Sequence, residues 1–175
     1  MYKLESYSNG GALVVNSADS DETYRATFNA ESEQEAEMIV VRLNQEVLLR
    51  VLAEHRFTVE TSGLELPNGL RILTDRENRS TLNDSFESMK HGLIPDTDWK
   101  AVNGWKVVGL AEIELMTKAV AAHVRGCFRG EYTVATTIND SVSIVETEEI
   151  DVAALFNAAY SAAYEEVMGA EVSVE

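Results

Sequence analysis

Hydrophobic and polar residues alternate over three short segments near the start of the chain. Tyr2 to Tyr7 and Ala12 to Val15 flank the turn Asn9-Gly10-Gly11, and Thr23 to Phe28 alternates again after the polar loop Asn16 to Glu22. Glycine and asparagine supply the positive φ angles that a tight hairpin needs. The pattern therefore predicts an antiparallel hairpin extended by a third strand.

A long helix is predicted next. Ser32-Glu33-Gln34-Glu35 has the pattern of a capping box, in which the hydroxyl and the glutamate each accept a hydrogen bond from a free backbone amide. The helical periodicity extends to about Glu54. Apolar residues lie on two roughly opposite faces, so the helix is either sandwiched inside the fold or meets another chain. The first face has Ala36, Ile39, Val40, Leu43, Val47 and Val51, and the second has Met38, Val41, Leu48, Leu49 and Leu52.

A hairpin and a shorter helix follow. Phe57 to Glu60 reads as a short strand, and Gly63 to Leu66 is expected to pair with Leu70 to Leu73 across Pro67-Asn68-Gly69. An Asn-Gly turn between alternating apolar runs is the strongest short-range hairpin signal. After the charged segment Thr74 to Arg79, a helix is predicted through Leu82, Phe86 and Met89.

A second hairpin signal precedes the helical end of the chain. Trp99-Lys100-Ala101 and Trp105 to Val108 bracket Asn103-Gly104. A clean apolar stripe then predicts a helix from Leu110 to Phe128, for which Gly130 is a credible C-cap. The segment Tyr132 to Val145 is rich in Thr, Val and Ile, which favours a strand, with a broken continuation of the helix as the alternative. A final helix is predicted from about Glu149 to Met168.

These elements predict an α+β fold, with an N-terminal antiparallel sheet packed on a long helix and then a mainly helical module with short hairpins. The division expected is residues 1–73 and 74–175, with one continuous domain as the alternative. A length of 175 residues is compatible with either arrangement.

The net charge of the chain disfavours two classes of binding partner. Thirty acidic residues against fourteen Lys and Arg give a net charge of −16, which disfavours binding to the phosphates of nucleic acid and to anionic membranes. No apolar run approaches the ~20 residues that a membrane-spanning helix needs. We therefore expect neither nucleic acid nor membrane as a partner.

Candidate chemistry is sparse. The sequence has no phosphate-binding loop, nucleophile elbow or zinc-protease motif. His123 and Cys127 fall on the apolar stripe, where a hydrogen-bonded core histidine and a small hydrophobic thiol are expected. The acidic clusters at Asp19 to Glu22 and Asp96 to Asp98 could hold a hard cation, but solvated turns are the favoured interpretation. We expect no catalytic, cofactor or metal site.

A resemblance covers about residues 73–138. Its most specific parts are Trp99 with the Asn103-Gly104 turn, and Ala121-Ala122-His123-Val124 with Cys127-Phe128. These resemble a domain of unknown function from tail-fibre-associated and tail-fibre assembly proteins of phages and prophages. The resemblance implies a phage context and transfers no site residue.

In that context the expected function is a virion structural or adaptor protein of the tail or tail-fibre apparatus. It would be made in the host cytoplasm, would contact other tail proteins and would form a homo-oligomer or symmetric assembly. The alternatives are a tail-fibre assembly chaperone and an acidic inhibitor of a host DNA-binding protein. The residues proposed to contact partners are Met38, Val41, Leu48, Leu52, Phe156, Tyr160 and Tyr164.

Overall fold

The computed structural model of the chain describes residues 1–16 and 25–169 and divides into two compact units. Unit 1 consists of Met1–Glu54 and Tyr132–Leu155, and unit 2 consists of His55–Glu131 and the segment from Phe156 onward. This division differs from the boundary expected after residue 73, because long helices contribute residues to both units. The α+β class predicted from the sequence is confirmed.

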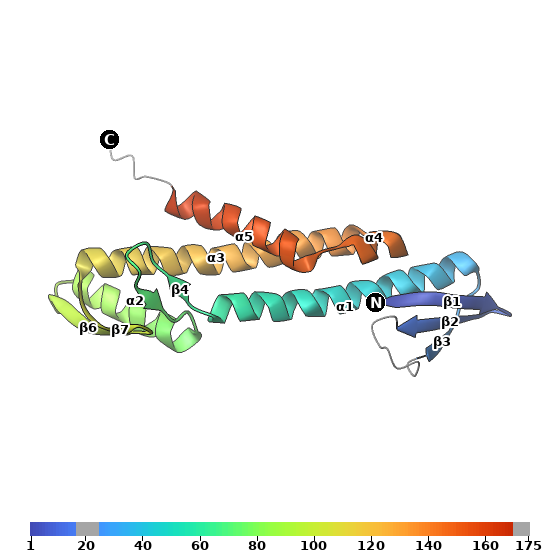
Figure 1. Cartoon of the computed structure of the whole chain (residues 1–175), viewed down its shortest axis with the longest axis horizontal. Helices are drawn as coiled ribbons and strands as arrows, with labels where there is room; N and C mark the ends of the chain where they lie inside the picture. Colours follow the sequence, from blue (N-terminus) through green and yellow to red (C-terminus); the bar gives the residue numbers. More distant parts are fainter. Residues whose placement is uncertain (17–24, 170–175) are drawn as a thin grey trace. The chain divides into compact units, whose positions relative to one another are not determined.

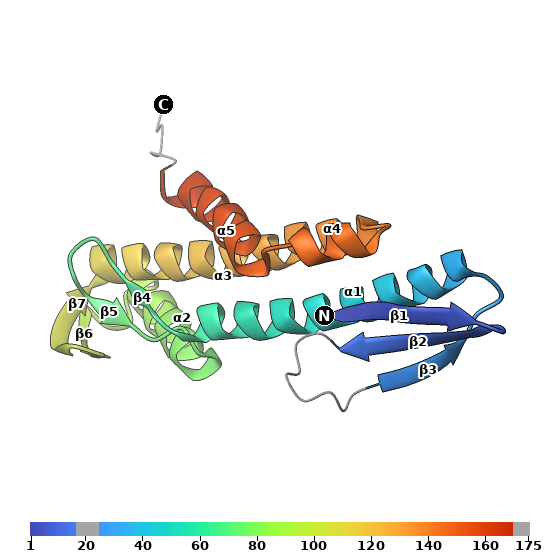
Figure 2. The ribbon, with the colours of Figure 1, turned by 45° about the vertical axis from the view of Figure 1, so that its right-hand side comes forward.

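Unit 1 contains a three-stranded antiparallel sheet in the order β1-β2-β3. Its strands lie alongside the first part of the first helix (Figures 1 and 2). The predicted turn is confirmed, since Asn9 and Gly10 have φ values of 50° and 78°. The acidic cluster at Asp19 to Glu22 lies outside the described residues. The elements of unit 1 are β1 (Tyr2–Ser8), β2 (Gly11–Asn16), β3 (Arg25–Asn29), the first part of α1 (Glu33–Thr61), the last part of α3 (Leu110–Asp140), α4 (Ile144–Glu149) and the first turn of α5 (Val152–Met168).

The capping box at the start of α1 is confirmed. The Glu35 amide donates to Ser32 Oγ over 3.2 Å, and Glu35 Oε2 accepts from the Glu31 amide over 2.7 Å. The helix continues to Thr61, so the strand predicted at Phe57 to Glu60 is wrong. The β-branched and aromatic residues of this segment favour a strand. The helix forms instead because the side chain of Glu60 is paired in the core of unit 2.

A buried amide holds β1 onto α1. Asn44, fully buried, accepts from the Tyr2 amide over 2.6 Å and donates to the Tyr2 carbonyl over 3.1 Å and to Thr147 Oγ1 over 3.2 Å. Next to it, Gln45 Nε2 donates to the carbonyls of Ile138 and Ser141, 3.0 Å away in each case. These bonds satisfy backbone groups at a strand start and a helix end.

Unit 2 contains two hairpins, and both are at the predicted positions. Asp75 caps the second helix by accepting from the amides of Glu77 and Asn78. Its hydrophobic core joins both hairpins to two helices and includes Leu66, Ile72, Leu82, Trp99, Val108, Ile113 and Met116. The elements of unit 2 are the end of α1, β4 (Leu64–Glu65), β5 (Arg71–Ile72), α2 (Arg76–Lys90), β6 (Asp96–Ala101), β7 (Gly104–Gly109), the first part of α3 (Leu110–Asp140) and most of α5 (Val152–Met168).

Helix α3 does not end at Gly130 but continues to Asp140, and α4 begins at Ile144. The C-cap and the favoured strand after Tyr132 are therefore wrong, and the alternative, a broken continuation of the helix, is confirmed. The two helical glycines have a packing role instead. A Cβ added at Gly126 would lie 2.8 Å from the Tyr160 ring, and one at Gly130 would lie 2.8 Å from the Phe156 ring. The glycines therefore let α5 approach α3 closely.

Candidate functional site

The hairpin β6–β7 has one buried and one exposed face. Side chains alternate along a strand, so Trp99, Ala101 and Val108 enter the core while Trp105 and Val107 face outward. Trp105 is 70% exposed and Val107 is 59% exposed. A tryptophan held this far into solvent on a rigid strand is an unusual use of a large apolar side chain.

Charged residues of β6 lie opposite this apolar row. In the strand register Trp105 is opposite Lys100, and Val107 is opposite Asp98. The Lys100 ammonium lies 5.8 Å from the centre of the Trp105 ring, within the range of a cation–π interaction. We call Asp98, Lys100, Trp105 and Val107 the hairpin surface.

Hydrogen bonds to the β4–β5 hairpin fix the position of the β6–β7 hairpin. Asn103, in the turn, donates to the Gly69 carbonyl over 2.9 Å and accepts from the Arg71 amide over 3.2 Å. The Val102 amide also donates to the Arg71 carbonyl over 2.9 Å. Three hydrogen bonds thus join the turn to the β4–β5 hairpin, two at Arg71 of β5 and one at Gly69 in the turn before it, so the hairpin surface is preorganised for contact.

A buried ion network lies elsewhere in unit 2. Glu60 is only 6% exposed. Its carboxylate is paired with Arg56 and with Arg79 Nη1, the latter at 2.8 Å. Arg56 Nε also lies 3.3 Å from a Glu131 carboxylate oxygen. Two cations and two anions balance, which is the condition for burying charge. The arrangement fixes the end of α1 against α2 and α3.

His123 is the core histidine that the sequence predicts. It is 2% exposed, with Nδ1 2.8 Å from the Tyr160 hydroxyl and Nε2 3.2 Å from the Glu60 carbonyl. A carbonyl can only accept, so Nε2 carries the proton and Nδ1 accepts from Tyr160. Burial lowers the pKa of His123, so the ring is neutral at pH 7.

The nearby thiol is not poised for nucleophilic chemistry. Cys127 Sγ lies 4.0 Å from His123 Nε2. Burial, with a smaller effect of the Glu60 charge, raises the pKa of the thiol to about 12. A nucleophilic cysteine needs a lowered pKa, so Cys127 acts as a small apolar side chain, as its place on the stripe indicates.

The first-helix residues proposed as partner contacts are mostly in the interior. Val41, Leu48 and Leu52 are at most 7% exposed, whereas Met38 is 38% exposed. Of the two possibilities for a helix with two apolar faces, the structure therefore favours the sandwiched helix. Met38 and Val41 also line a hollow of about 370 Å³ beside residues 142–145.

The aromatic row of α5 likewise packs within the chain. Phe156 is fully buried, and its ring lies 6.3 Å from that of Tyr160, which lies 6.0 Å from that of Tyr164. Both tyrosines are half-buried. Phe156 faces Gly130 and Tyr160 faces Gly126, so Phe156 packs within the chain, whereas contact of the two half-buried tyrosines with a partner stays a prediction.

Trp105 is the exposed residue that the sequence reasoning missed, although a signal was present. Its hairpin partner strand carries Trp99, and any two-residue turn at this point places Trp99 and Trp105 on opposite faces. Because Trp99 continues the core pattern, Trp105 has to face away from the core. Counting the parity of the register would have identified the hairpin surface.

The described residues include neither a metal-binding cluster nor a membrane-spanning helix. Asp96 and Asp98 are exposed on β6, and residues 1–16 and 25–169 contain no group of three His, Cys, Asp or Glu residues that could hold a metal ion. Within the same ranges, every helix is too short or too polar to cross a membrane.

Comparison with protein-family models matches residues 44–155 to a family described as a domain of unknown function (DUF4376). The match extends further at both ends than residues 73–138, on which the resemblance rests. It includes both hairpins, α2 and all of α3, whereas the sheet of unit 1 lies outside it. Comparisons with curated proteins and with solved structures find no match.

Proposed function

Because the chain belongs to the DUF4376 family, whose description assigns no activity, we propose a function from its own residues. It is a structural or adaptor protein of the tail or tail-fibre apparatus of a phage, and it acts by protein–protein contacts. The phage context comes from the motif around Trp99 and His123. The contact role comes from the surface of unit 2.

The exposed hairpin surface is the observation that carries this proposal. Tryptophan is over-represented among the residues that contribute most to binding at protein interfaces. Here the ring is 70% exposed on a hairpin whose turn is hydrogen-bonded to a second hairpin. Rigid presentation lowers the entropy that binding costs, so this surface is suited to a stable contact.

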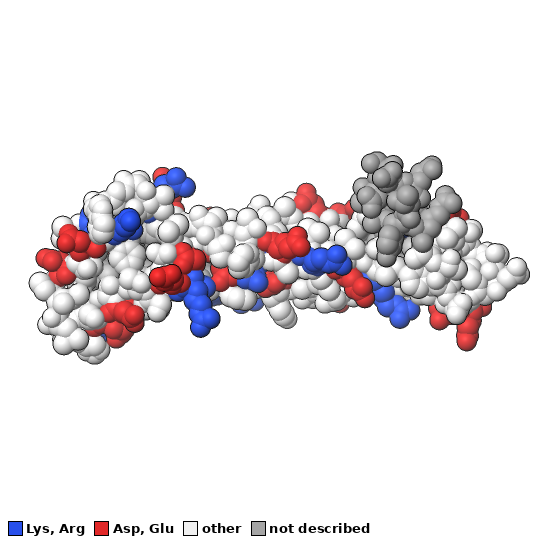
Figure 3. Space-filling view, turned by 90° about the horizontal axis from the view of Figure 1, so that it is seen from below, with Lys and Arg blue, Asp and Glu red and all other residues white. Residues whose placement is uncertain are grey.

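The partner is another tail or tail-fibre protein, and the assembly is a homo-oligomer or a larger symmetric structure. Repeated tail components need the same contact at each copy. The net charge of −16 favours a partner with a basic surface and keeps the chain away from the phage genome before assembly. Over the face in Figure 3, acidic and basic side chains are interspersed, unlike the one-sign surface of a nucleic-acid mimic.

The test compares two exposed aromatic residues during assembly. Trp105→Gln removes the centre of the hairpin surface, while Tyr132→Gln removes a ring that is 68% exposed on α3. Loss of an interface anchor worth about 2 kcal/mol lowers affinity about 30-fold. Quantitative mass spectrometry of purified particles should find wild type and Tyr132→Gln at a fixed ratio to the tail-tube protein and Trp105→Gln depleted at least tenfold.

Thermal unfolding followed by circular dichroism should give equal midpoints for the two variants, which separates loss of contact from loss of fold. Equal incorporation of both variants would contradict the role of Trp105. Absence of the wild-type protein from particles, together with abundance in the lysate, would exclude a virion component. That result would support the assembly chaperone, which should make insoluble fibre protein soluble on co-expression.

A further inference from the structure

A groove of about 640 Å³ lies between α2 and α3 in unit 2. Its lining contains the arginines Arg76, Arg79 and Arg125 and no acidic residue. The chain has thirty acidic and fourteen basic residues, so the positive charge of this lining is opposite to the net negative charge of the chain. The volume is in the range of pockets that bind ligands.

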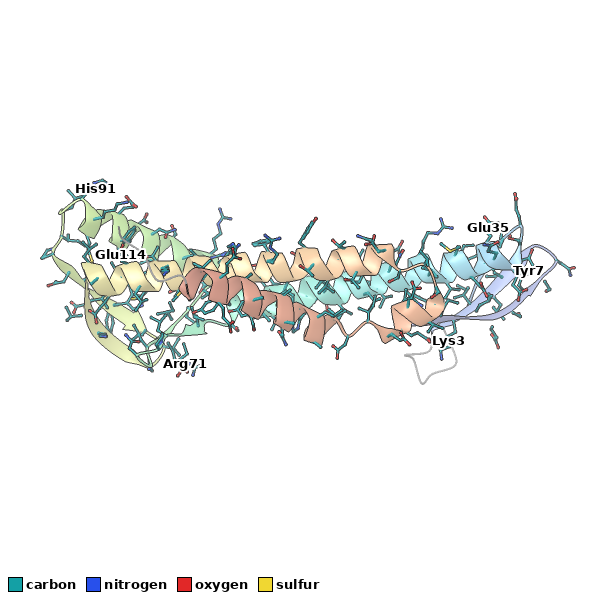
Figure 4. All side chains as sticks on the ribbon, turned by 90° about the horizontal axis from the view of Figure 1, so that it is seen from above. Lys3, Tyr7, Glu35, Arg71, His91 and Glu114 are labelled. Carbon is teal, nitrogen blue, oxygen red and sulfur yellow. The ribbon has the colours of Figure 1, made fainter. Side chains whose placement is uncertain are left out.

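The arginines gather at one end of this groove. His91, which follows α2, and Glu114, near the start of α3, lie at the same end of unit 2 (Figure 4). The two helices therefore run in opposite directions. Arg76 and Arg79 at the start of α2 are consequently near Arg125, which is far along α3, and the other end of the groove has no charged lining residue.

Two of the three guanidinium groups already have carboxylate partners. Arg79 pairs with Glu60, and Arg125 Nη2 lies 2.8 Å from a Glu166 carboxylate oxygen. Each guanidinium has five N–H donors, so both keep donors for a ligand. Arg76 is exposed and has no ion pair among the described residues, which leaves it as the principal anchor.

Along α3 the wall is formed by the apolar Val120, Ala121 and Val124, with Thr117 one turn before them, and α2 adds the polar Ser80 and Asn83. From Thr117 to Arg125 the helix rises about 12 Å, the length of about four residues of extended chain. A small inorganic anion would occupy only the arginine end. A ligand with a carboxylate at one end and aliphatic groups along its length would use the whole groove.

We propose that this groove binds a short extended peptide segment of a partner protein, with acidic residues at the arginine end and aliphatic side chains against α3. Guanidinium groups match carboxylates in a planar, two-bond geometry. The chain has a net charge of −16 and therefore repels a polyanion strongly. A peptide segment with one or two negative charges is repelled much less. The site is separate from the hairpin surface, so it goes beyond the proposed function and is tested independently of it.

The test is an NMR titration of the full chain with a blocked tetrapeptide of two glutamates and two leucines, in both orders. Matched peptides replace the glutamates with glutamines or the leucines with serines. Resonances of residues on both walls should shift, and each matched peptide should bind about tenfold more weakly, the change expected for loss of one charge-assisted hydrogen bond or comparable apolar contact.

The protein variants are Arg76→Gln and Arg129→Gln. Arg129 is exposed on α3 outside the groove, so its loss changes the net charge equally. Arg76→Gln should weaken the acidic peptide at least fivefold, and Arg129→Gln should leave its affinity unchanged. The proposal is overturned by an absence of shifts at millimolar peptide, by equal weakening in both variants, or by inorganic phosphate binding the same residues as tightly as the peptide.

Discussion

At the scale of single residues, unit 2 shows how an acidic chain buries polar groups. Glu60 is buried with its carboxylate between two arginines, and its carbonyl accepts from His123 and from Thr74 Oγ1, the latter over 2.5 Å. A buried polar group without such partners costs a few kcal/mol. The side chains around Glu60 therefore belong to one structural network, which explains why a histidine and a thiol lie close together without forming a reactive pair.

The lowered pKa of His123 predicts how stability depends on pH. The unfolded histidine gains its proton near pH 6.5, whereas the folded one gains it at lower pH because burial disfavours the charge. Between the two pKa values the unfolded state binds more protons, so the free energy of unfolding falls as the pH decreases through 6.5. The loss from this group ends once the pH is below the folded pKa.

Urea denaturation at pH 7.5 and 5.5 measures this effect. His123→Gln should reduce the difference in unfolding free energy between the two pH values, although the variant is less stable at both. His91→Gln is the control, because the His91 side chain is 66% exposed and pairs with the exposed Glu87, a surface pair of little energy, so its loss should change the difference much less than loss of His123. An unchanged difference in His123→Gln would show that another group causes the pH dependence.

At the scale of elements, the contact of α5 with α3 depends on two glycines. Replacing a helical glycine with alanine ordinarily stabilises by up to about 1 kcal/mol. At Gly130 the new methyl group would lie 2.8 Å from the ring of Phe156, which is fully buried and cannot move aside. Overpacking of a core costs about 1–3 kcal/mol, so the clash outweighs the gain.

We therefore expect Gly130→Ala to lower the unfolding free energy by about 1–2 kcal/mol, measured by chemical denaturation. Gly109→Ala is the matched control, since a Cβ there has no neighbour within 4 Å, and it should change stability little. If Gly130→Ala is as stable as wild type, the two helices must be able to move apart at no cost.

Elements defined by local chemistry were predictable from the sequence, and those defined by distant contacts were not. Ser32 and the Asn-Gly turns act through neighbours within a few residues, so their patterns identify a helix start and two hairpins directly. Gly130 reads as a helix end because glycine commonly ends helices, and only the ring of Phe156 shows that it is a packing position. The end of α1 was likewise hidden by the partners of Glu60.

The same distinction explains the fate of the candidate contact residues. Apolar periodicity identifies the faces of a helix that are buried, but it does not say whether the cover is the same chain or another one. Val41, Leu48 and Phe156 turned out to be covered by their own chain. Trp105 was predictable in principle, because strand parity is a local property.

At the scale of the whole molecule, sixteen uncompensated negative charges oppose folding, because a compact chain holds like charges closer together. Exposed ion pairs such as Lys106 with Glu112, at 2.7 Å, act in the other direction but contribute only about 0–1 kcal/mol each. Salt screens both effects. Raising the ionic strength from about 10 to 150 mM shortens the screening length from about 30 to 8 Å, which removes long-range repulsion more completely than contact attraction.

The thermal unfolding midpoint should therefore rise as sodium chloride is added over this range. If screening contributes about 1–2 kcal/mol, the rise is about 2–8 °C for a chain of this size. Glu37→Gln combined with Glu114→Gln removes two exposed carboxylates, so this variant should melt higher at low salt and respond less to added salt. A midpoint that falls with salt in the wild type would mean that ion pairs, rather than net repulsion, dominate its electrostatics. The excess of acidic residues would then have to be explained by a basic partner alone.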